Sequence, residues 1–329
     1  MRKSLLLLCW LSSLSLCYAE FSWGPLNLVN GCRIFDSKGI AVKTLPGEFC
    51  QFYTNGDLLT ATVESLKMID QNNHVKWELK GAFHHQLNKS LDEKRILVLD
   101  SFIKRSKHNP NIIVEKFMVL DLVGKILFQA TSEDLLSQVS VKMYAPNQQT
   151  HLNSFYEIPK LTTNRVLPSF LKEGNFILNS YRSGVFILSP DLKKVLHHFV
   201  FKSSIANQVH DVQVLESGNI LFFNNMSVDS KRGNPFSAIE ELDMVTNEIV
   251  LSFSGNPTGI FYSLFCGGVQ ELDPEHILFS HVLTGTYIYS KRTKQIITNI
   301  HETHFKDGLF SPSQQVKMMD LRSFLSHWK

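Results

Sequence analysis

The chain has 329 residues, of which 43% are hydrophobic and 19% are charged, and its formal net charge is +3. This composition excludes an intrinsically disordered chain and supplies enough apolar residues for one large core or two ordinary ones. A net charge this close to zero predicts no general attraction to nucleic acid.

The N-terminus has the pattern of a secretory signal peptide. Arg2 and Lys3 precede an apolar run over residues 5–16, which is too short to span a membrane, and Ala19 is the small residue before the expected cleavage site. Removal of residues 1–19 takes away two of the 33 basic residues and none of the 30 acidic ones, so the net charge falls from +3 to +1. The mature chain, residues 20–329, is predicted to be periplasmic or secreted and to have no membrane span.

Cysteine usage fits an oxidising compartment. Cys32 and Cys50 are predicted to form a disulfide that stabilises the fold by about 3 kcal/mol through the unfolded chain. Cys266 then remains as a small core residue. The spacing of the cysteines fits neither a zinc site nor a C-x-x-C redox motif.

Six β-hairpins recur along the chain, each with two apolar strands around a turn rich in Asp, Lys, Asn or Gly. They cover residues 34–42, 68–77, 119–128, 187–196, 241–250 and 288–297. All but the first follow a further apolar strand that starts near residue 58, 96, 176, 220 or 277. Four short strands per unit, repeated every 40 to 60 residues or so, are typical of propeller blades.

The sequence therefore predicts an all-β fold, a six-bladed β-propeller in one domain, with a β-sandwich or a seven-bladed ring as alternatives. The first hairpin lies so near the mature N-terminus that residues 305–319 are expected to supply its two inner strands, followed by a short helix at 321–328. Residues 131–140 and 160–170 are predicted to be helical or irregular insertions.

Three predicted inner strands begin with histidine, at His85, His151 and His210. In a propeller the first strand of each blade lines the central channel, so residues at its start face a common pocket. Three imidazoles around one pocket are not needed for packing. Their shared position therefore predicts a functional site.

These residues also carry a resemblance to a known family. His84-His85, His151-Leu152-Asn153-Ser154, Asn179-Ser180-Tyr181-Arg182, His210-Asp211 and Phe223-Asn224-Asn225 together resemble the bacterial arylsulfate sulfotransferases, over roughly residues 36–300. The resemblance implies a secreted six-bladed propeller that moves a sulfuryl group from a phenolic sulfate ester to a phenol. It implies no nucleotide donor, no metal and no other cofactor.

The resemblance also implies roles for individual residues. His210 matches the nucleophile, because a neutral imidazole nitrogen can attack and later leave near neutral pH. Arg182 and Asn153 are expected to hold the sulfuryl oxygens, and either His85 or His151 to exchange the proton with the phenol. Tyr156, Phe223 and Asn225 are expected to contact the substrate, with the two aromatic rings as the floor of an aryl pocket.

Two other classes of function remain open. A propeller that binds a ligand or protein without catalysis is favoured by departures from the family pattern, namely Gln149-Thr150 and Phe236-Ser237 where the family has Asp-Trp and Ser-Arg. A metalloenzyme that uses the three histidines as ligands is the second alternative. The expected partners are small phenolic molecules, and the sequence leaves both a monomer and a homodimer open.

Overall fold

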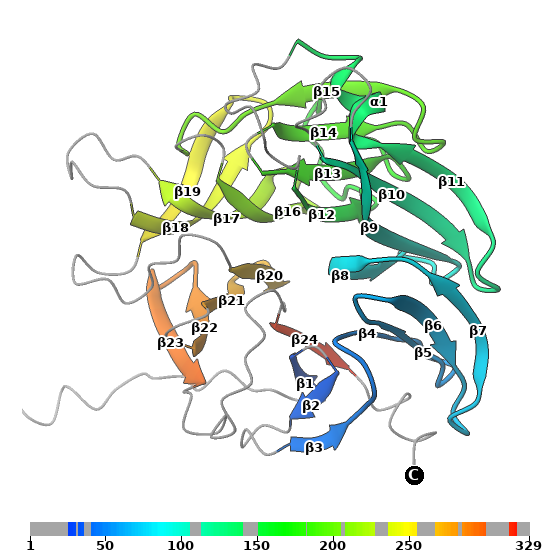
Figure 1. The fold of residues 1–329 in the computed structure, drawn as a ribbon. Helices are drawn as coiled ribbons and strands as arrows, with labels where there is room; N and C mark the ends of the chain where they lie inside the picture. The colour runs from blue at the N-terminus through cyan, green and yellow to red at the C-terminus, as the bar shows by residue number, and fades with distance from the viewer. Residues whose placement is uncertain are drawn as a thin grey trace, which may run out of the picture.

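Antiparallel β-sheets of four strands each make up nearly all of the computed structural model. It describes residues 26–30, 32–35, 41–105, 113–140, 151–181, 183–204, 208–227, 236–254, 267–281, 285–300 and 316–320. Six such sheets surround a common centre, with one edge strand of each sheet facing inward (Figure 1). The six-bladed β-propeller predicted from the hairpin pattern is thereby confirmed, and the sheets are named blades 1 to 6.

Blades 1 to 3 hold the first part of the chain. Blade 1 has the order β24 (Val316–Asp320), β1 (Leu26–Asn30), β2 (Arg33–Phe35) and β3 (Ala41–Thr44). Blade 2 comprises β4 (Phe49–Phe52), β5 (Leu58–Ala61), β6 (Ser65–Ile69) and β7 (Val75–Lys80). Blade 3 comprises β8 (Phe83–Lys89), β9 (Arg95–Arg105), β10 (Ile113–Asp121) and β11 (Ile126–Thr131).

Blades 4 to 6 repeat the same order from the centre outward. Blade 4 comprises β12 (Leu152–Glu157), β13 (Phe176–Ser180), β14 (Gly184–Leu188) and β15 (Val195–Phe199). Blade 5 comprises β16 (Val209–Val214), β17 (Ile220–Ser227), β18 (Phe236–Asp243) and β19 (Glu248–Ser254). Blade 6 comprises β20 (Gly268–Asp273), β21 (His276–His281), β22 (Gly285–Ser290) and β23 (Gln295–Ile300).

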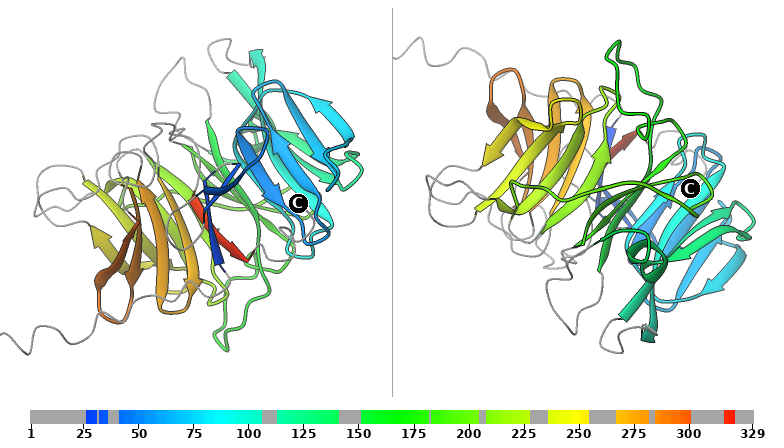
Figure 2. Two further views of the ribbon diagram at one scale, coloured as in Figure 1. Left: turned by 90° about the horizontal axis from the view of Figure 1, so that it is seen from below. Right: turned by 90° about the horizontal axis from the view of Figure 1, so that it is seen from above.

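Burial follows the position of a strand within its blade. Every residue of β13 and β14 is buried, whereas the outermost strand β7 alternates between exposed and half-buried residues. Blades stack face to face, so both faces of a middle strand are covered and its sequence can be apolar throughout. The views from below and above show the strands of adjacent blades lying side by side (Figure 2).

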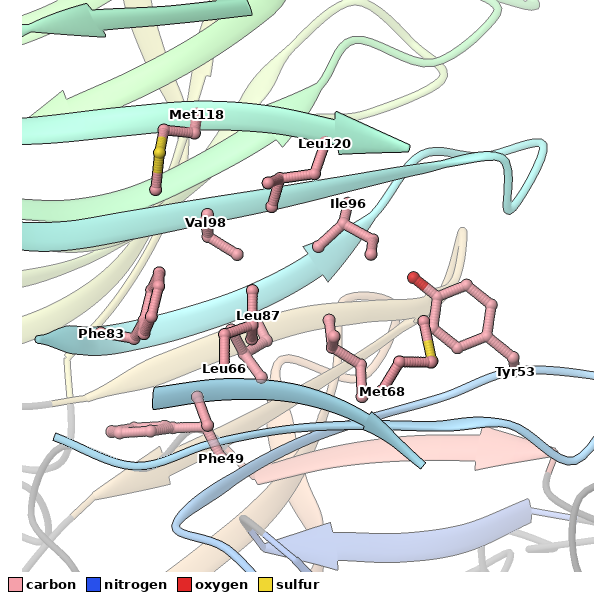
Figure 3. Close-up of a cluster of buried hydrophobic side chains, with 12 residues drawn as sticks. Phe49, Tyr53, Leu66, Met68, Phe83, Leu87, Ile96, Val98, Met118 and Leu120 are labelled. Carbon is pink, nitrogen blue, oxygen red and sulfur yellow. The ribbon is translucent and has the colours of Figure 1, made fainter. Parts of the chain in front are cut away.

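The hydrophobic core is divided into clusters that lie between neighbouring blades. Between blades 2 and 3, Phe49, Leu66 and Met68 face Phe83 and Val98 (Figure 3). Similar clusters join blades 3 and 4, 4 and 5, and 5 and 6. Each blade is thus held mainly by its two neighbours, as in other repeat folds.

Both ends of the chain contribute to blade 1, but not in the predicted proportion. β24 supplies only the innermost strand, pairing antiparallel with β1 from Leu26↔Asp320 to Asn30↔Val316. The expectation of two inner strands from residues 305–319 was wrong, because β1 and β2 form a tight N-terminal hairpin that already provides the second strand. This closure pairs the edge of β1 that would otherwise be free and joins the two ends of the chain in one blade.

The predicted disulfide is confirmed. Cys32 and Cys50 are bonded with their Cα atoms 4.9 Å apart, so the bridge connects blade 1 to β4 of blade 2. The insertion at 131–140 contains the short helix α1 (Ser132–Leu136), which Thr131 caps reciprocally with Asp134, and 160–170 is irregular. Residues 1–19, Cys266 and residues 321–328 lie outside the described residues. Among the residues that the structure describes, no helix is long and apolar enough to cross a membrane.

Candidate functional site

Three neighbouring inner strands depart from regular pairing near their first residues. β8 shifts register between Phe83 and Leu87, β12 between Leu152 and Ser154, and β16 between His210 and Gln213. Left-handed backbone occurs at the same level, with φ of 60° at His85, 48° at His151 and 52° at Asp211. Such a conformation costs about 1–3 kcal/mol for residues other than glycine, and a bulge redirects the side chains around it. Blades 3, 4 and 5 therefore share a local distortion where the predicted site residues lie.

A row of rings crosses these three blades. The centroid of His85 lies 4.6 Å from that of His84 and 4.7 Å from that of His151, both edge to face. Tyr181 then lies 5.6 Å from His151 and 6.3 Å from His210. The structure thus brings His85, His151 and His210 into one cluster, together with His84 and Tyr181.

His210 has a defined hydrogen-bond partner. Its Nδ1 lies 2.6 Å from Oδ1 of Asn225, an oxygen that can only accept, so Nδ1 carries the hydrogen and Nε2 has a free lone pair. Burial lowers the pKa of His210 to about 4, against the opposing effect of the Asn225 hydrogen bond. At neutral pH the ring is therefore an uncharged imidazole of fixed tautomer.

The other end of the row is also uncharged at rest. Burial lowers the pKa of His84 to about 3 and the pKa of His85 well below its usual value, and the neighbouring His151 lowers both further. The Nδ1 atoms of His84 and His85 contact each other directly. From the sequence, His84 is named in the His84-His85 motif without a role of its own, and the structure makes it part of the cluster.

Two asparagines of blade 4 hold the residue before His210. Nδ2 of Asn153 and Nδ2 of Asn179 both donate to the carbonyl oxygen of Val209, at 3.1 and 2.8 Å. One N–H group of the Asn153 amide thus donates to the backbone of β16. Its second N–H group is available for the predicted role as a donor to substrate. Asn179 is a positioning residue that sequence reasoning passed over, although it lies in the same motif as Tyr181.

A buried carboxylate lies directly after the predicted nucleophile. Asp211 accepts hydrogen bonds from the Tyr156 hydroxyl, from Nε2 of Gln86 at 3.0 Å and from the backbone N–H of Val269 at 2.8 Å. These partners come from β12, β8 and β20, so one side chain links four blades. Tyr156, predicted to contact an aryl group, has its hydroxyl committed to Asp211, and burial raises the pKa of that hydroxyl well above its usual value.

Three predicted site residues remain: Asn225, Phe223 and Arg182. Asn225 is fully buried on the site side of β17, and its contact with substrate would pass through His210. Phe223 is fully buried in the cluster between blades 5 and 6, with its ring against Gly267, which places it in the core instead of on a pocket wall. Arg182 lies outside the described residues, between Tyr181 and Ser183.

A separate cavity of about 920 Å³ lies between blades 5 and 6. Glu216, Glu241, Glu271 and Lys291 line it, and Lys291 bridges Glu241 and Glu271 at 3.0 and 2.6 Å. Glu216 follows the last residue of β16 whereas His210 is near its first, so this cavity is at the opposite end of the strands from the histidines. We therefore treat this cavity and the histidine cluster as separate sites.

The geometry of the cluster does not resemble a metal centre. Among the described residues, no group of three or more His, Cys, Asp or Glu side chains is arranged to hold a metal ion. The rings of His84, His85 and His151 meet edge to face. The three-histidine metalloenzyme considered from the sequence finds no support in this arrangement.

Several solved structures are similar to this chain. A protein of unknown function from Bacteroides caccae has a TM-score of 0.55 and 13% sequence identity, over 86% of this chain and 96% of that one. The WD40 β-propeller domain of Doa1 has a TM-score of 0.48 and 13% identity, over 80% of this chain and 71% of that one. The Cps50 (Swd1) β-propeller domain of Myceliophteria thermophila has a TM-score of 0.44 and 13% identity, over 73% and 63%. The six four-stranded sheets of the chain itself make it a β-propeller by fold.

Comparison with known sequences identifies no family for this chain. No protein-family model and no curated protein matches the chain. Fold likeness at this level of identity says nothing about activity, because propellers carry many unrelated functions. The functional conclusion depends on the histidine cluster.

Proposed function

We propose that the protein transfers a sulfuryl group from a phenolic sulfate ester to a phenol, with His210 as the nucleophile. The observation that carries this proposal is the hydrogen bond from Nδ1 of His210 to Asn225, in a ring that burial keeps uncharged. A neutral imidazole with one nitrogen fixed as a donor offers the other as a nucleophile. The resemblance of the surrounding motifs to arylsulfate sulfotransferases supplies the substrate class.

In the first half-reaction Nε2 of His210 attacks sulfur, the N–S bond forms, and the S–O bond to the aryl oxygen breaks. The departing phenolate takes a proton from a neighbouring imidazole, which must first be protonated from solvent because the row is uncharged at rest. His210 then carries a sulfuryl group on a positively charged ring, and its Nδ1–H bond to Asn225 strengthens because the donor has become cationic. In the second half-reaction an acceptor phenol loses its proton to the same neighbour and attacks sulfur, and Nε2 leaves as a neutral imidazole.

Several features of the structure suit this chemistry. The Val209 carbonyl held by Asn153 and Asn179 restrains the backbone next to His210, and the left-handed Asp211 follows it directly. Restraining a nucleophile on both sides removes part of the entropic cost of reaction. The Cys32–Cys50 disulfide is of the kind that persists in oxidising compartments, which supports the proposal of a periplasmic or secreted protein.

The test is transfer from para-nitrophenyl sulfate to a phenol, without nucleotide and with a chelator present. We expect turnover by the wild type, a mass increase of one SO₃ group on the peptide that contains His210, and loss of at least about 10³-fold in rate for His210→Asn. His198→Asn is the matched control, because His198 on the outer strand β15 bonds only the Ser183 carbonyl oxygen and packs on Phe186. A folded wild type without turnover on several donors would instead favour a propeller that binds without catalysis.

A further inference from the structure

A carboxylate that the proposed reaction has not used lies beside the histidine row. Glu115, on the third strand of blade 3, is fully buried. Its Oε2 accepts a hydrogen bond of 2.9 Å from the backbone N–H of Leu152, the residue after His151. Its Oε1 lies 3.3 Å from Nε2 of His84. The carboxylate is thus placed at the end of the row, in contact with both blade 3 and blade 4.

The contact between Glu115 and His84 is electrostatic in character. The two atoms are within ion-pair distance, but the His84 Nε2 atom is buried and has no aligned hydrogen-bond acceptor. A negative charge at 3.3 Å nevertheless favours a hydrogen on this nitrogen over a lone pair. His84 is therefore expected to carry its hydrogen on Nε2.

The tautomer of His84 decides the tautomer of His85. The Nδ1 atoms of the two rings contact each other, so one must donate and the other accept. With the hydrogen of neutral His84 on Nε2, its Nδ1 is the acceptor and Nδ1 of His85 is the donor. Nε2 of His85 is then left with a lone pair, which is the form of a general base.

We propose that Glu115, acting through His84, makes His85 the residue that exchanges the proton with the phenol. This inference rests on the proposed sulfuryl transfer and decides between His85 and His151. When Nε2 of His85 takes the proton of the acceptor phenol, the positive charge is shared along the two rings toward the Glu115 carboxylate. In the half-reaction that sulfates His210, Nε2 of His85 first takes a proton from solvent and then gives this proton to the departing phenolate. Glu115 and His84 are positioning residues, and His85 is the catalytic one.

Other charged and titratable groups around His85 do not supply this function. His151 and His210 are imidazoles whose charge would oppose a second one, and Tyr181 lies beyond His151. On β9 and β10, Asp100 is paired with Lys116 at 3.0 Å, so this pair adds no net charge. Glu115 is the carboxylate that can offset the cost of a buried imidazolium.

The first experiment uses leaving groups of different basicity. Phenyl sulfate needs a proton for its leaving group, whereas para-nitrophenyl sulfate needs little help. For Glu115→Gln we expect sulfation of His210 to slow about 10²-fold with phenyl sulfate and to stay within about threefold of wild type with para-nitrophenyl sulfate. His85→Asn should give the same pattern. The contacts from Glu115 through His84 to His85 form a relay. If Glu115→Gln fails to fold, His84→Gln interrupts this relay at its second residue and should show the same dependence on the leaving group.

The controls separate this proposal from a structural effect. Glu157→Gln removes a partly buried carboxylate that pairs with Arg95 at the far end of β12, and it should leave the leaving-group dependence unchanged. Equal losses on both donors for Glu115→Gln, or leaving-group dependence in His151→Asn instead of His85→Asn, would overturn the assignment. Absence of the SO₃ mass increase in the wild type would refute the proposed function itself.

A second measurement does not depend on activity. The ¹⁵N chemical shifts of the imidazoles in labelled protein at pH 7 should show His84 protonated on Nε2 and His85 protonated on Nδ1. In Glu115→Gln the preference should weaken and the two tautomers should mix. The opposite tautomers in the wild type would overturn the relay whatever the substrate.

Discussion

The link between Tyr156 and Asp211 gives the sharpest test of how the blades are held around the channel. Asp211 is 2% exposed and accepts three hydrogen bonds from three other blades. A hydrogen bond to a charged group contributes about 1.5–3 kcal/mol, and an unpaired buried donor costs about 1–3 kcal/mol. Tyr156→Phe should therefore lower the free energy of unfolding by about 2 kcal/mol. Asp211→Asn should lower it by about 3 kcal/mol, because its amide nitrogen must face a donor.

The assay is urea unfolding at pH 7, followed by circular dichroism and by intrinsic fluorescence. The double variant should be less destabilised than the sum of the single variants, with a coupling energy of about 1–2 kcal/mol. Tyr289→Phe is the control, because Tyr289 is also a tyrosine with little exposed surface but lines the cavity between blades 5 and 6. A loss below about 0.5 kcal/mol for both Tyr156→Phe and Asp211→Asn, or strict additivity, would refute this account of the network.

Three further predictions concern other parts of the molecule. The pKa of His210 falls from 6.5 to about 4 on folding. As the pH falls, His210 is protonated in the unfolded chain at a higher pH than in the folded protein. The free energy of unfolding therefore falls between about pH 6.5 and pH 4. Between pH 7 and pH 5 the loss is about 2 kcal/mol, and His210→Asn should flatten the urea-derived profile by that amount. Replacing Cys32 and Cys50 by serine should cost about 3 kcal/mol in the same unfolding assay, and a cost near zero would mean that blade 1 is held by strand pairing alone. Asn225→Ala removes the acceptor for Nδ1 of His210 and should slow its sulfation about 10²-fold, with a loss of about 1–3 kcal/mol in stability because a buried donor is left unpaired, whereas an unchanged rate would show that the tautomer is set by another group.

The strand pattern could be predicted from the sequence because it depends on local signals. All six predicted hairpins correspond to the two outer strands of a blade, as at β6 and β7 or β22 and β23. The turns between them hold residues that tolerate left-handed backbone, such as Asn73 and Asn247. Closure of blade 1 was predicted only in part, because pairing of β1 with β24 joins residues about three hundred positions apart and leaves no local mark.

For the candidate site too, residues marked by a local sequence signal could be predicted, and residues whose role depends on distant contacts could not. His85, His151 and His210 could be selected because each opens a predicted inner strand. Glu115 and Gln86 could not, since their roles depend on contacts across blades, such as the one between Gln86 and Asp211, 125 positions apart. The one available signal was a charged residue inside an apolar strand, as in Ile113-Val114-Glu115, which indicates a buried and therefore partnered carboxylate.

By itself, the sequence determined the number of blades, the three outer strands of blades 2 to 6, the outer hairpin of blade 1 and the cysteine pair, since alternation, turn residues and spacing are properties of neighbouring positions. Only the tertiary structure decided which side chains face one another at the centre. The bulges of β8, β12 and β16 redirect side chains by an amount that the sequence pattern does not specify. Packing between strands and blades, and not order along the chain, places Asn225 against His210, Glu115 beside the histidine row and Phe223 in the core.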